Sequence, residues 1–142
     1  MKNTVNTFYS LLLSLVVLTS CQKESANSEA DAAKNKIAEK IWLLEYTQVT
    51  TSAGVKTKSY IGQTTYFISF YKDGSTTDSD GIAGTYDVVK GTSGLELQVK
   101  AKTQGGMDFQ YSYVIESVSD KSLVMIKNVN GVDNKNFFSP KN

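Results

Sequence analysis

Residues 95–101, with the sequence LELQVKA, decide the fold class because apolar and polar side chains alternate along them without a break. In an extended chain, every second side chain points to the same face, so the apolar set shares one face and the polar set the other. This two-residue period is typical of a β-strand with one buried face. The apolar set is Leu95, Leu97, Val99 and Ala101.

The same alternation recurs on both sides of this segment, separated by turn dipeptides such as Asp73-Gly74 and Asn130-Gly131. In the first strand we expect Trp42, Leu44 and Tyr46 to share a face. The polar run 75–81 predicts a loop. A chain of short strands with short connections predicts an all-β antiparallel fold, either a barrel or a sandwich. The expected strands are residues 42–51, 55–61, 65–71, 84–88, 95–101, 107–118 and 122–127, with a short last strand at 137–138.

A series of landmarks points to one of these architectures. Trp42 opens the first strand, residues 70–74 form an F-x-x-D-G hairpin, residues 84–86 read G-x-Y, and residues 119–125 lead into a closing strand. This order resembles the lipocalin-like domains of small bacterial lipoproteins. The resemblance spans residues 41–127 and implies an antiparallel lipocalin-like β-barrel of seven or eight strands, occupying residues 41–142.

The N-terminus has the pattern of an export signal. Lys2 is followed by a mostly apolar run over residues 8–18, which is too short for a membrane-spanning helix. The sequence Leu18-Thr19-Ser20-Cys21 then resembles the lipobox of bacterial lipoproteins, which implies cleavage after residue 20 and lipidation of Cys21. We therefore expect residues 1–20 to be a signal peptide, and the mature chain to be an outer-membrane lipoprotein of the bacterial cell envelope, facing the periplasm or the surface. An ordinary secretory signal followed by an incidental cysteine is the alternative.

Residues 21–40 are predicted to form a tether that contains a short helix. The segment after Cys21 is polar, and residues 29–40 are rich in helix formers without Gly or Pro. Ala30, Ala33 and Ile37 recur at helical spacing. This helix would either cover one end of the following domain or remain a solvated stalk.

Composition excludes several functions. The chain of 142 residues has no histidine, one cysteine and no arginine, which excludes histidine catalysis, Cys/His zinc sites and disulfide frameworks. Loss of residues 1–20 removes Lys2 and leaves a mature chain with no net charge, so we expect no nucleic-acid partner. Asp73, Asp78 and Asp80 lie in a turn-rich segment; the run from 78 to 81 contains a fragment of a calcium-loop pattern, which turn chemistry alone explains. We predict no enzymatic activity, no metal and no cofactor.

Aromatic residues on the alternating faces give the best indication of function. An eight-stranded barrel is either filled by its own side chains or holds one small ligand. Large aromatic rings favour a filled core, whereas buried tyrosine hydroxyls need partners that water or a ligand can supply. We expect a membrane-anchored binding protein for a small hydrophobic or amphipathic ligand; the alternative is a filled barrel that engages another envelope protein. The candidate ligand-binding residues are Trp42, Tyr46, Tyr66, Phe70, Tyr86, Tyr111 and Tyr113.

Overall fold

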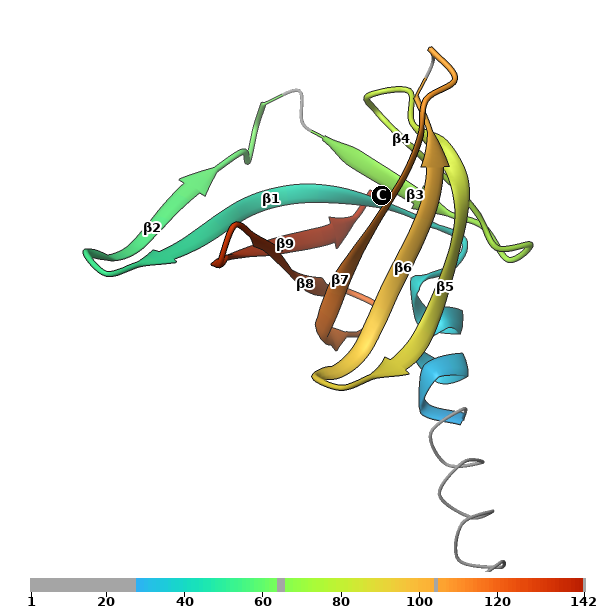
Figure 1. The fold of residues 1–142 in the computed structure, drawn as a ribbon, viewed down its shortest axis with the longest axis horizontal. Helices are drawn as coiled ribbons and strands as arrows, with labels where there is room; N and C mark the ends of the chain where they lie inside the picture. The colour runs from blue at the N-terminus through green and yellow to red at the C-terminus, as the bar shows by residue number, and fades with distance from the viewer. Residues whose placement is uncertain (1–27, 64–65, 104, 142) are drawn as a thin grey trace, which may run out of the picture.

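The computed structural model describes residues 28–63, 66–103 and 105–141, so the predicted signal peptide and Cys21 lie outside the described residues. This part of the chain forms a short helix over residues 28–37 and nine β-strands (Figure 1). The strands are β1 (Lys40–Thr51), β2 (Gly54–Ser59), β3 (Phe67–Phe70), β4 (Ser75–Asp78), β5 (Ala83–Gly91), β6 (Gly94–Lys102), β7 (Asp108–Val118), β8 (Leu123–Val129) and β9 (Val132–Pro140).

Pairing between the first and last strands closes the sheet. One edge of β1 pairs with β9, from Trp42 opposite Pro140 to Val49 opposite Asn134. The other edge pairs first with β3 and then with β2. The closed ring therefore has eight antiparallel strands in the order β1-β3-β4-β5-β6-β7-β8-β9. A closed up-and-down barrel of eight strands is the architecture of lipocalins, and the predicted barrel is confirmed.

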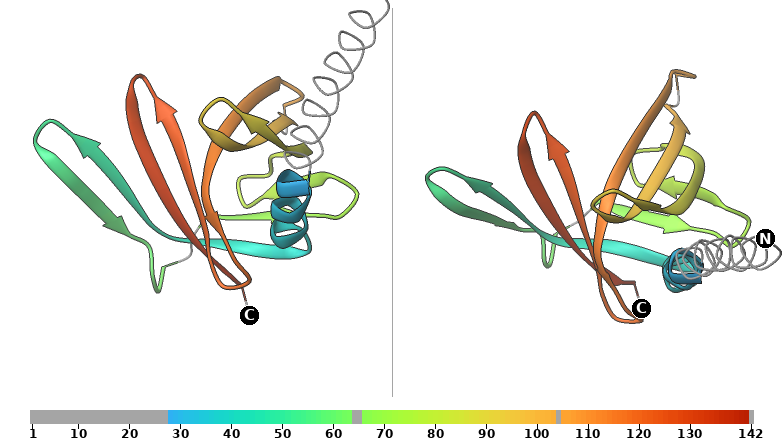
Figure 2. Two further views of the ribbon diagram at one scale, coloured as in Figure 1. Left: turned by 90° about the horizontal axis from the view of Figure 1, so that it is seen from below. Right: turned by 60° about the horizontal axis from the view of Figure 1, so that its bottom comes forward.

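Strand β2 lies outside this ring. It pairs with β1 alone, whose residues 46–49 pair on their other edge with β9, and the tip of the β1–β2 hairpin projects from the barrel (Figure 2). All six residues of β2 are exposed, which explains why this segment lacks a buried apolar face. The sequence predicted a strand here but gave no sign that it leaves the barrel.

The polar run after Asp73 is not only a loop, as the sequence predicted. Residues Ser75–Asp78 form β4, which pairs with β3 and β5. Thr76 and Asp78 face inward and are buried, and the Thr76 hydroxyl donates a hydrogen bond to the Ser69 carbonyl oxygen at 2.9 Å. The prediction was wrong here because a polar strand that satisfies its hydrogen bonds inside a barrel resembles a loop in sequence.

The helix closes one end of the barrel. Only residues 83–85 of β5 pair with β4. The helix packs beside the rest of β5, where Lys34 forms an ion pair of 2.8 Å with Asp87. Ala30, Ala33 and Ile37 are buried in the same core as the barrel strands. Of the two roles that the sequence left open, cover and solvated stalk, the helix therefore has the first.

A β-bulge in β1 changes the face of one predicted site residue. Leu44 is opposite Phe138, whereas Tyr46 is opposite Phe137, because the register shifts between Leu44 and Tyr46. Neighbouring residues of a strand point to opposite faces, and Phe138 is in the core. Tyr46 therefore points outward, where its ring stacks on Phe137 at 4.2 Å. The prediction that it shares a face with Trp42 and Leu44 was wrong.

Candidate functional site

The two ends of the barrel differ in how fully side chains fill them. Trp42, Phe70 and Tyr86 lie at the helix-covered end and are 0%, 1% and 4% exposed. The Phe70 and Tyr86 rings meet edge to face at 4.8 Å, and the Tyr86 hydroxyl donates to the Tyr71 carbonyl oxygen at 3.0 Å. Burial raises the pKa of Tyr86 to about 12. These three predicted site residues thus form the packed core of the closed end.

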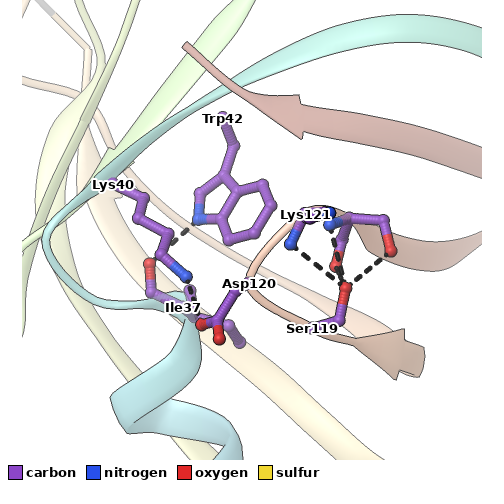
Figure 3. Close-up of polar contacts among 7 residues, drawn as sticks. Ile37, Lys40, Trp42, Ser119, Asp120 and Lys121 are labelled. Carbon is purple, nitrogen blue, oxygen red and sulfur yellow. Dashed lines mark hydrogen bonds and ion pairs between the residues drawn. The ribbon is translucent and has the colours of Figure 1, made fainter. Parts of the chain in front are cut away.

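Trp42 also fixes the helix at this end (Figure 3). Its indole Nε1 donates a hydrogen bond of 2.9 Å to the Ile37 carbonyl oxygen, at the last turn of the helix. The Lys40 ammonium lies 5.5 Å from the centre of the indole ring and forms an ion pair of 2.9 Å with Asp120, in the β7–β8 turn. This end of the barrel is therefore held shut by packing and polar contacts.

The opposite end collects the remaining predicted tyrosines. In an antiparallel barrel, successive connections alternate between the two ends, so the β4–β5, β6–β7 and β8–β9 connections all lie away from the helix. Tyr66, Tyr111 and Tyr113 are half-buried there and pack against the core. The Tyr111 ring stacks on Phe109 at 5.6 Å and meets Tyr113 edge to face at 5.5 Å. We call this group, with Asp78 and Lys127, the open-end cluster.

Asp78 belongs to the cluster and has its carboxylate fully engaged. Its Oδ2 accepts a hydrogen bond of 3.0 Å from the Tyr66 hydroxyl. Its Oδ1 accepts from the backbone N–H groups of Asp80 at 2.9 Å and Ile82 at 3.0 Å, which shapes the β4–β5 loop. The resemblance of this loop to a calcium site is explained by that turn. Within the described ranges, no group of three or more acidic or sulfur ligands is placed to hold a metal ion.

Lys127 is the member that sequence reasoning missed. On β8, Leu123 and Met125 are fully buried, and the two-residue period places Lys127 on the same inward face. Its ammonium lies 5.0 Å from the centre of the Tyr111 ring and 5.6 Å from that of Tyr113. The sequence contained an indication of this position, because Lys127 continues the alternation that starts with Leu123 and Met125.

Two hydroxyls of the cluster have no protein partner among the described residues. The hydrogen bonds found there include one from the Tyr66 hydroxyl but none from Tyr111 or Tyr113. Burial, with the nearby Asp78 charge, raises the pKa of both Tyr111 and Tyr113 above the ordinary value. A tyrosine hydroxyl is protonated at neutral pH even at its ordinary pKa of about 10, so both hydroxyls can donate to a bound molecule.

The residues around the cluster offer apolar surface. Leu44, Ile82 and Phe109 pack partly buried against the core beside it. An open groove of about 730 Å³ lies across the ends of β5, β6 and β7, but it is lined mainly by exposed, outward-facing residues such as Lys100 and Gln110 and by no member of the cluster. The open end thus combines a cation, hydroxyl donors and apolar walls, which suits a small molecule with both polar and apolar parts.

The comparisons with known proteins are few. A lipocalin-like protein from Bacteroides uniformis, solved by crystallography, is similar over 73% of this chain and 97% of that chain, with 20% identity and a TM-score of 0.40. No family model matches the sequence, and no curated protein matches it either. Within the part of the chain that the structure describes, no helix has the length and apolar character needed to cross a membrane.

Proposed function

We propose that this chain is a lipid-anchored binding protein of the bacterial cell envelope that holds a small amphipathic molecule in the open end of its barrel. The asymmetry between the two ends supports the binding role. Side chains fill the closed end around Trp42, whereas Tyr111, Tyr113 and Lys127 point into the open end with unused hydrogen-bond donors. Ligand sites combine mostly apolar walls with a few such convergent polar groups.

The anchor is proposed from the sequence around Cys21. Acyl chains contribute about 0.8 kcal/mol per buried methylene, so two or three chains would hold the protein on the outer membrane permanently. The tether from Cys21 to the helix at residue 28 reaches at most ~25 Å, at about 3.5 Å per residue. Because the helix lies at the closed end, the tether would direct that end toward the membrane and the open end away from it.

No catalytic role is proposed for the open-end cluster. Its single carboxylate, Asp78, accepts three hydrogen bonds, from the Tyr66 hydroxyl and from the backbone of the β4–β5 loop, and these give it a structural role. The rival role is a filled barrel that engages another envelope protein, and the experiment below distinguishes the two.

Native mass spectrometry of the protein extracted from its own membrane tests the binding role. We expect an additional mass of a few hundred daltons that is lost on collisional activation. Replacement of Tyr111 and Tyr113 by Trp, which fills the open end, should abolish this mass while the protein stays folded. A spectrum of the free protein, or of a complex with another protein chain only, would contradict the binding role and favour the rival.

The anchor is tested separately with Cys21→Ser. We expect the wild-type protein to carry a lipid mass on Cys21 and to fractionate with membranes, and the variant to be released. An unmodified thiol in the wild type, or a variant that stays with the membrane, would contradict the anchor but leave the binding role standing.

A further inference from the structure

We propose that the free edge of β7, over residues 108–113, binds an extended, uncharged polypeptide segment of a partner protein, which adds to the sheet as a further strand. We call this part of the strand the β7 edge. The inference goes beyond the proposed function, because it holds whether or not the barrel carries a small molecule. It rests on a gap in the barrel wall, on the direction of the backbone groups there, and on the lack of residues that prevent pairing.

The barrel wall is incomplete between β7 and β8. Residues 108–115 of β7 pair with β6, whereas pairing with β8 begins only at Val114, which is opposite Ile126. Toward the open end, β7 and the β8–β9 hairpin run apart (Figure 1 and Figure 2). Within the described part of the chain, no strand therefore pairs with the β7 edge on the side away from β6.

The backbone groups of the β7 edge point into this gap. In an antiparallel pair, the backbone N–H and C=O groups of every second residue point to the partner strand, and those of the residues between point away from it. The Thr103 N–H donates to the Met107 carbonyl oxygen at 3.0 Å, so the register directs the odd-numbered residues of β7 to β6. The backbone groups of Gln110 and Ser112 point away from β6, and both residues are exposed.

The β7 edge lacks the residues that protect edge strands from pairing. Lysine or proline commonly blocks such edges, and the exposed strand β2 carries Lys56 and Lys58. Residues 109–113 read FQYSY, with no charge, no proline and three aromatic residues that favour strands. Asp108, at the start of the edge, forms an ion pair of 3.4 Å with Lys102. The β7 edge is therefore suited to pair with an uncharged strand.

The shape and chemistry of the edge define its occupant. A row of backbone donors and acceptors is matched by another extended backbone. An added strand continues both faces of β7, so its side chains alternate between Tyr111 and Tyr113 on the inner face and Gln110 and Ser112 on the outer face. Aromatic rings pair well with β-branched residues across strands. An open groove of about 300 Å³ on the outer face, lined by residues that include Gln98, has room for the polar side chains. The expected segment alternates β-branched apolar and neutral polar residues.

A second copy of this chain fits the β7 edge less well. Its own β7 could exchange hydrogen bonds only through Gln110 and Ser112, because Val114 is already paired with Ile126 in each copy. Its β2 would bring two lysines to an edge whose one carboxylate already forms an ion pair. The observations therefore favour a segment of another protein.

Amide hydrogen exchange, measured by NMR on the full chain, tests the free edge itself. We expect the amides of Gln110 and Ser112 to exchange fast, and those of Tyr111 and Tyr113, which are bonded to β6, to exchange slowly. Slow exchange of Gln110 and Ser112 in the free protein would show that the edge is already covered, and would overturn the inference.

A peptide probe then tests strand addition. The probe is a short acetylated and amidated peptide of alternating Thr and Val, and its control is the same peptide methylated on its backbone nitrogens. At a concentration ten times its dissociation constant, the probe should slow exchange of the Gln110 and Ser112 amides about tenfold. The methylated peptide has no backbone donors and should bind at least about tenfold more weakly.

Two proline variants assign binding to the β7 edge. Ser112→Pro removes an N–H that points into the gap, at a position where an edge strand tolerates proline, and should weaken binding of the probe at least about tenfold. Thr57→Pro is the matched control on β2. The Tyr60 N–H donates to the Glu45 carbonyl oxygen at 2.7 Å, so by the same alternation the backbone groups of Thr57 point away from β1. This variant should keep the affinity of the wild type.

Each other outcome overturns the inference. Absence of binding by the probe, or equal binding of the methylated peptide, would show that no strand adds to β7. Binding lost equally in Thr57→Pro would place the peptide elsewhere. A dimer of the free chain that Ser112→Pro abolishes, detected by analytical ultracentrifugation, would assign the edge to a second copy instead of a partner protein. None of these results bears on whether the barrel holds a small molecule.

Discussion

The indole Nε1 of Trp42 donates a hydrogen bond of 2.9 Å to the carbonyl oxygen of Ile37, and so ties the first strand of the barrel to the end of the preceding helix. Both side chains are 0% exposed. Glu39, between them in sequence, has a left-handed φ of 61°, and its N–H donates to the Phe70 carbonyl oxygen at 2.7 Å. Helix end, turn and strand thus form one unit, and the helix is part of the folded barrel.

Trp42→Phe should lower the free energy of unfolding by about 2–4 kcal/mol. The change leaves the Ile37 carbonyl without its donor in a buried position and removes part of a large core side chain. Chemical denaturation followed by circular dichroism measures the effect. Tyr46→Phe is the control, because Tyr46 lies on the outer face and should change stability by less than about 0.5 kcal/mol. Equal stability of Trp42→Phe and wild type would contradict the role given to the indole.

Gly84→Ala should destabilise the barrel because the β5–β6 pair has no room for a side chain at that position. A methyl group on Gly84 would overlap the backbone of Lys100 and come within 2.6 Å of the Ala101 Cα. Backbone atoms of a paired strand cannot move away freely, so we expect a loss of about 1–3 kcal/mol in the free energy of unfolding.

Gly105→Ala is the matched control for that substitution. Gly105 lies in the β6–β7 connection at the same end of the barrel, and the nearest atom to an added methyl group would be the Thr103 hydroxyl at an ordinary 3.7 Å. Thermal unfolding of the two variants side by side should separate them by several degrees. A loss of stability in both variants would point to a general cost of replacing glycine rather than to the close approach of β5 and β6.

The strands that sequence predicted well are those with a clean buried face. Along β6, Leu97, Val99 and Ala101 are buried as their alternation indicated. Strand β4 was missed because its inward residues, Thr76 and Asp78, are polar, and some of their hydrogen-bond partners, such as the Ser69 carbonyl and the Tyr66 hydroxyl, lie on or beside another strand. The last strand was predicted at 137–138, but pairing with β1 and β8 extends it over Val132–Pro140. Polar residues of an end strand show little periodicity of their own.

The candidate site was predicted in part for a related reason. Alternation placed Tyr111 and Tyr113 inside correctly, since both lie on a regular strand. Tyr46 was placed on the wrong face, because a bulge shifts the register by one residue and no local pattern marks it. The separation of the aromatics into a closed and an open end depends on which connections share an end, and that is a property of the whole ring of strands.

The ion pair between Lys34 and Asp87 should stabilise the docked helix at pH values above those at which the aspartate is protonated. A hydrogen bond from Lys34 lowers the pKa of Asp87 below its ordinary value of about 3.9. A pKa that is lowered in the folded state contributes stability at pH values above the ordinary pKa. This contribution is lost as the pH falls through the lowered pKa. Because the pair is largely exposed, we expect Asp87→Asn to cost less than about 1 kcal/mol at neutral pH.

The pH dependence identifies this pair. The difference in free energy of unfolding between wild type and Asp87→Asn should be greatest at neutral pH and should vanish once the carboxylate is protonated in both folded and unfolded states. A double-mutant cycle with Lys34→Gln measures the coupling at neutral pH. A difference that persists unchanged in strong acid would show that Asp87 stabilises the helix by packing rather than by charge.

Tyrosine ionisation should unfold the barrel at high pH. Burial is the main cause that raises the pKa of Tyr66, Tyr86, Tyr111 and Tyr113, and for Tyr86 the value is about 12. A raised pKa contributes stability that is fully present below the ordinary value of about 10 and is lost as the pH rises through the raised value. We therefore expect the free energy of unfolding to fall steadily above about pH 10, with cooperative unfolding before these four tyrosines ionise.

Absorbance of the phenolate reports tyrosine ionisation and circular dichroism reports unfolding, so the two signals are compared over the same pH titration. In the folded protein, part of the absorbance change should be delayed until the barrel unfolds, whereas in concentrated guanidinium the whole change should occur in one step near pH ~10. Tyr66→Phe should reduce the delayed step only, and it should cost about 1 kcal/mol at neutral pH because the hydrogen bond to Asp78 is lost. If the delayed step kept its full size in Tyr66→Phe, Tyr66 would be ionising in the folded barrel, and its burial beside Asp78 would be excluded.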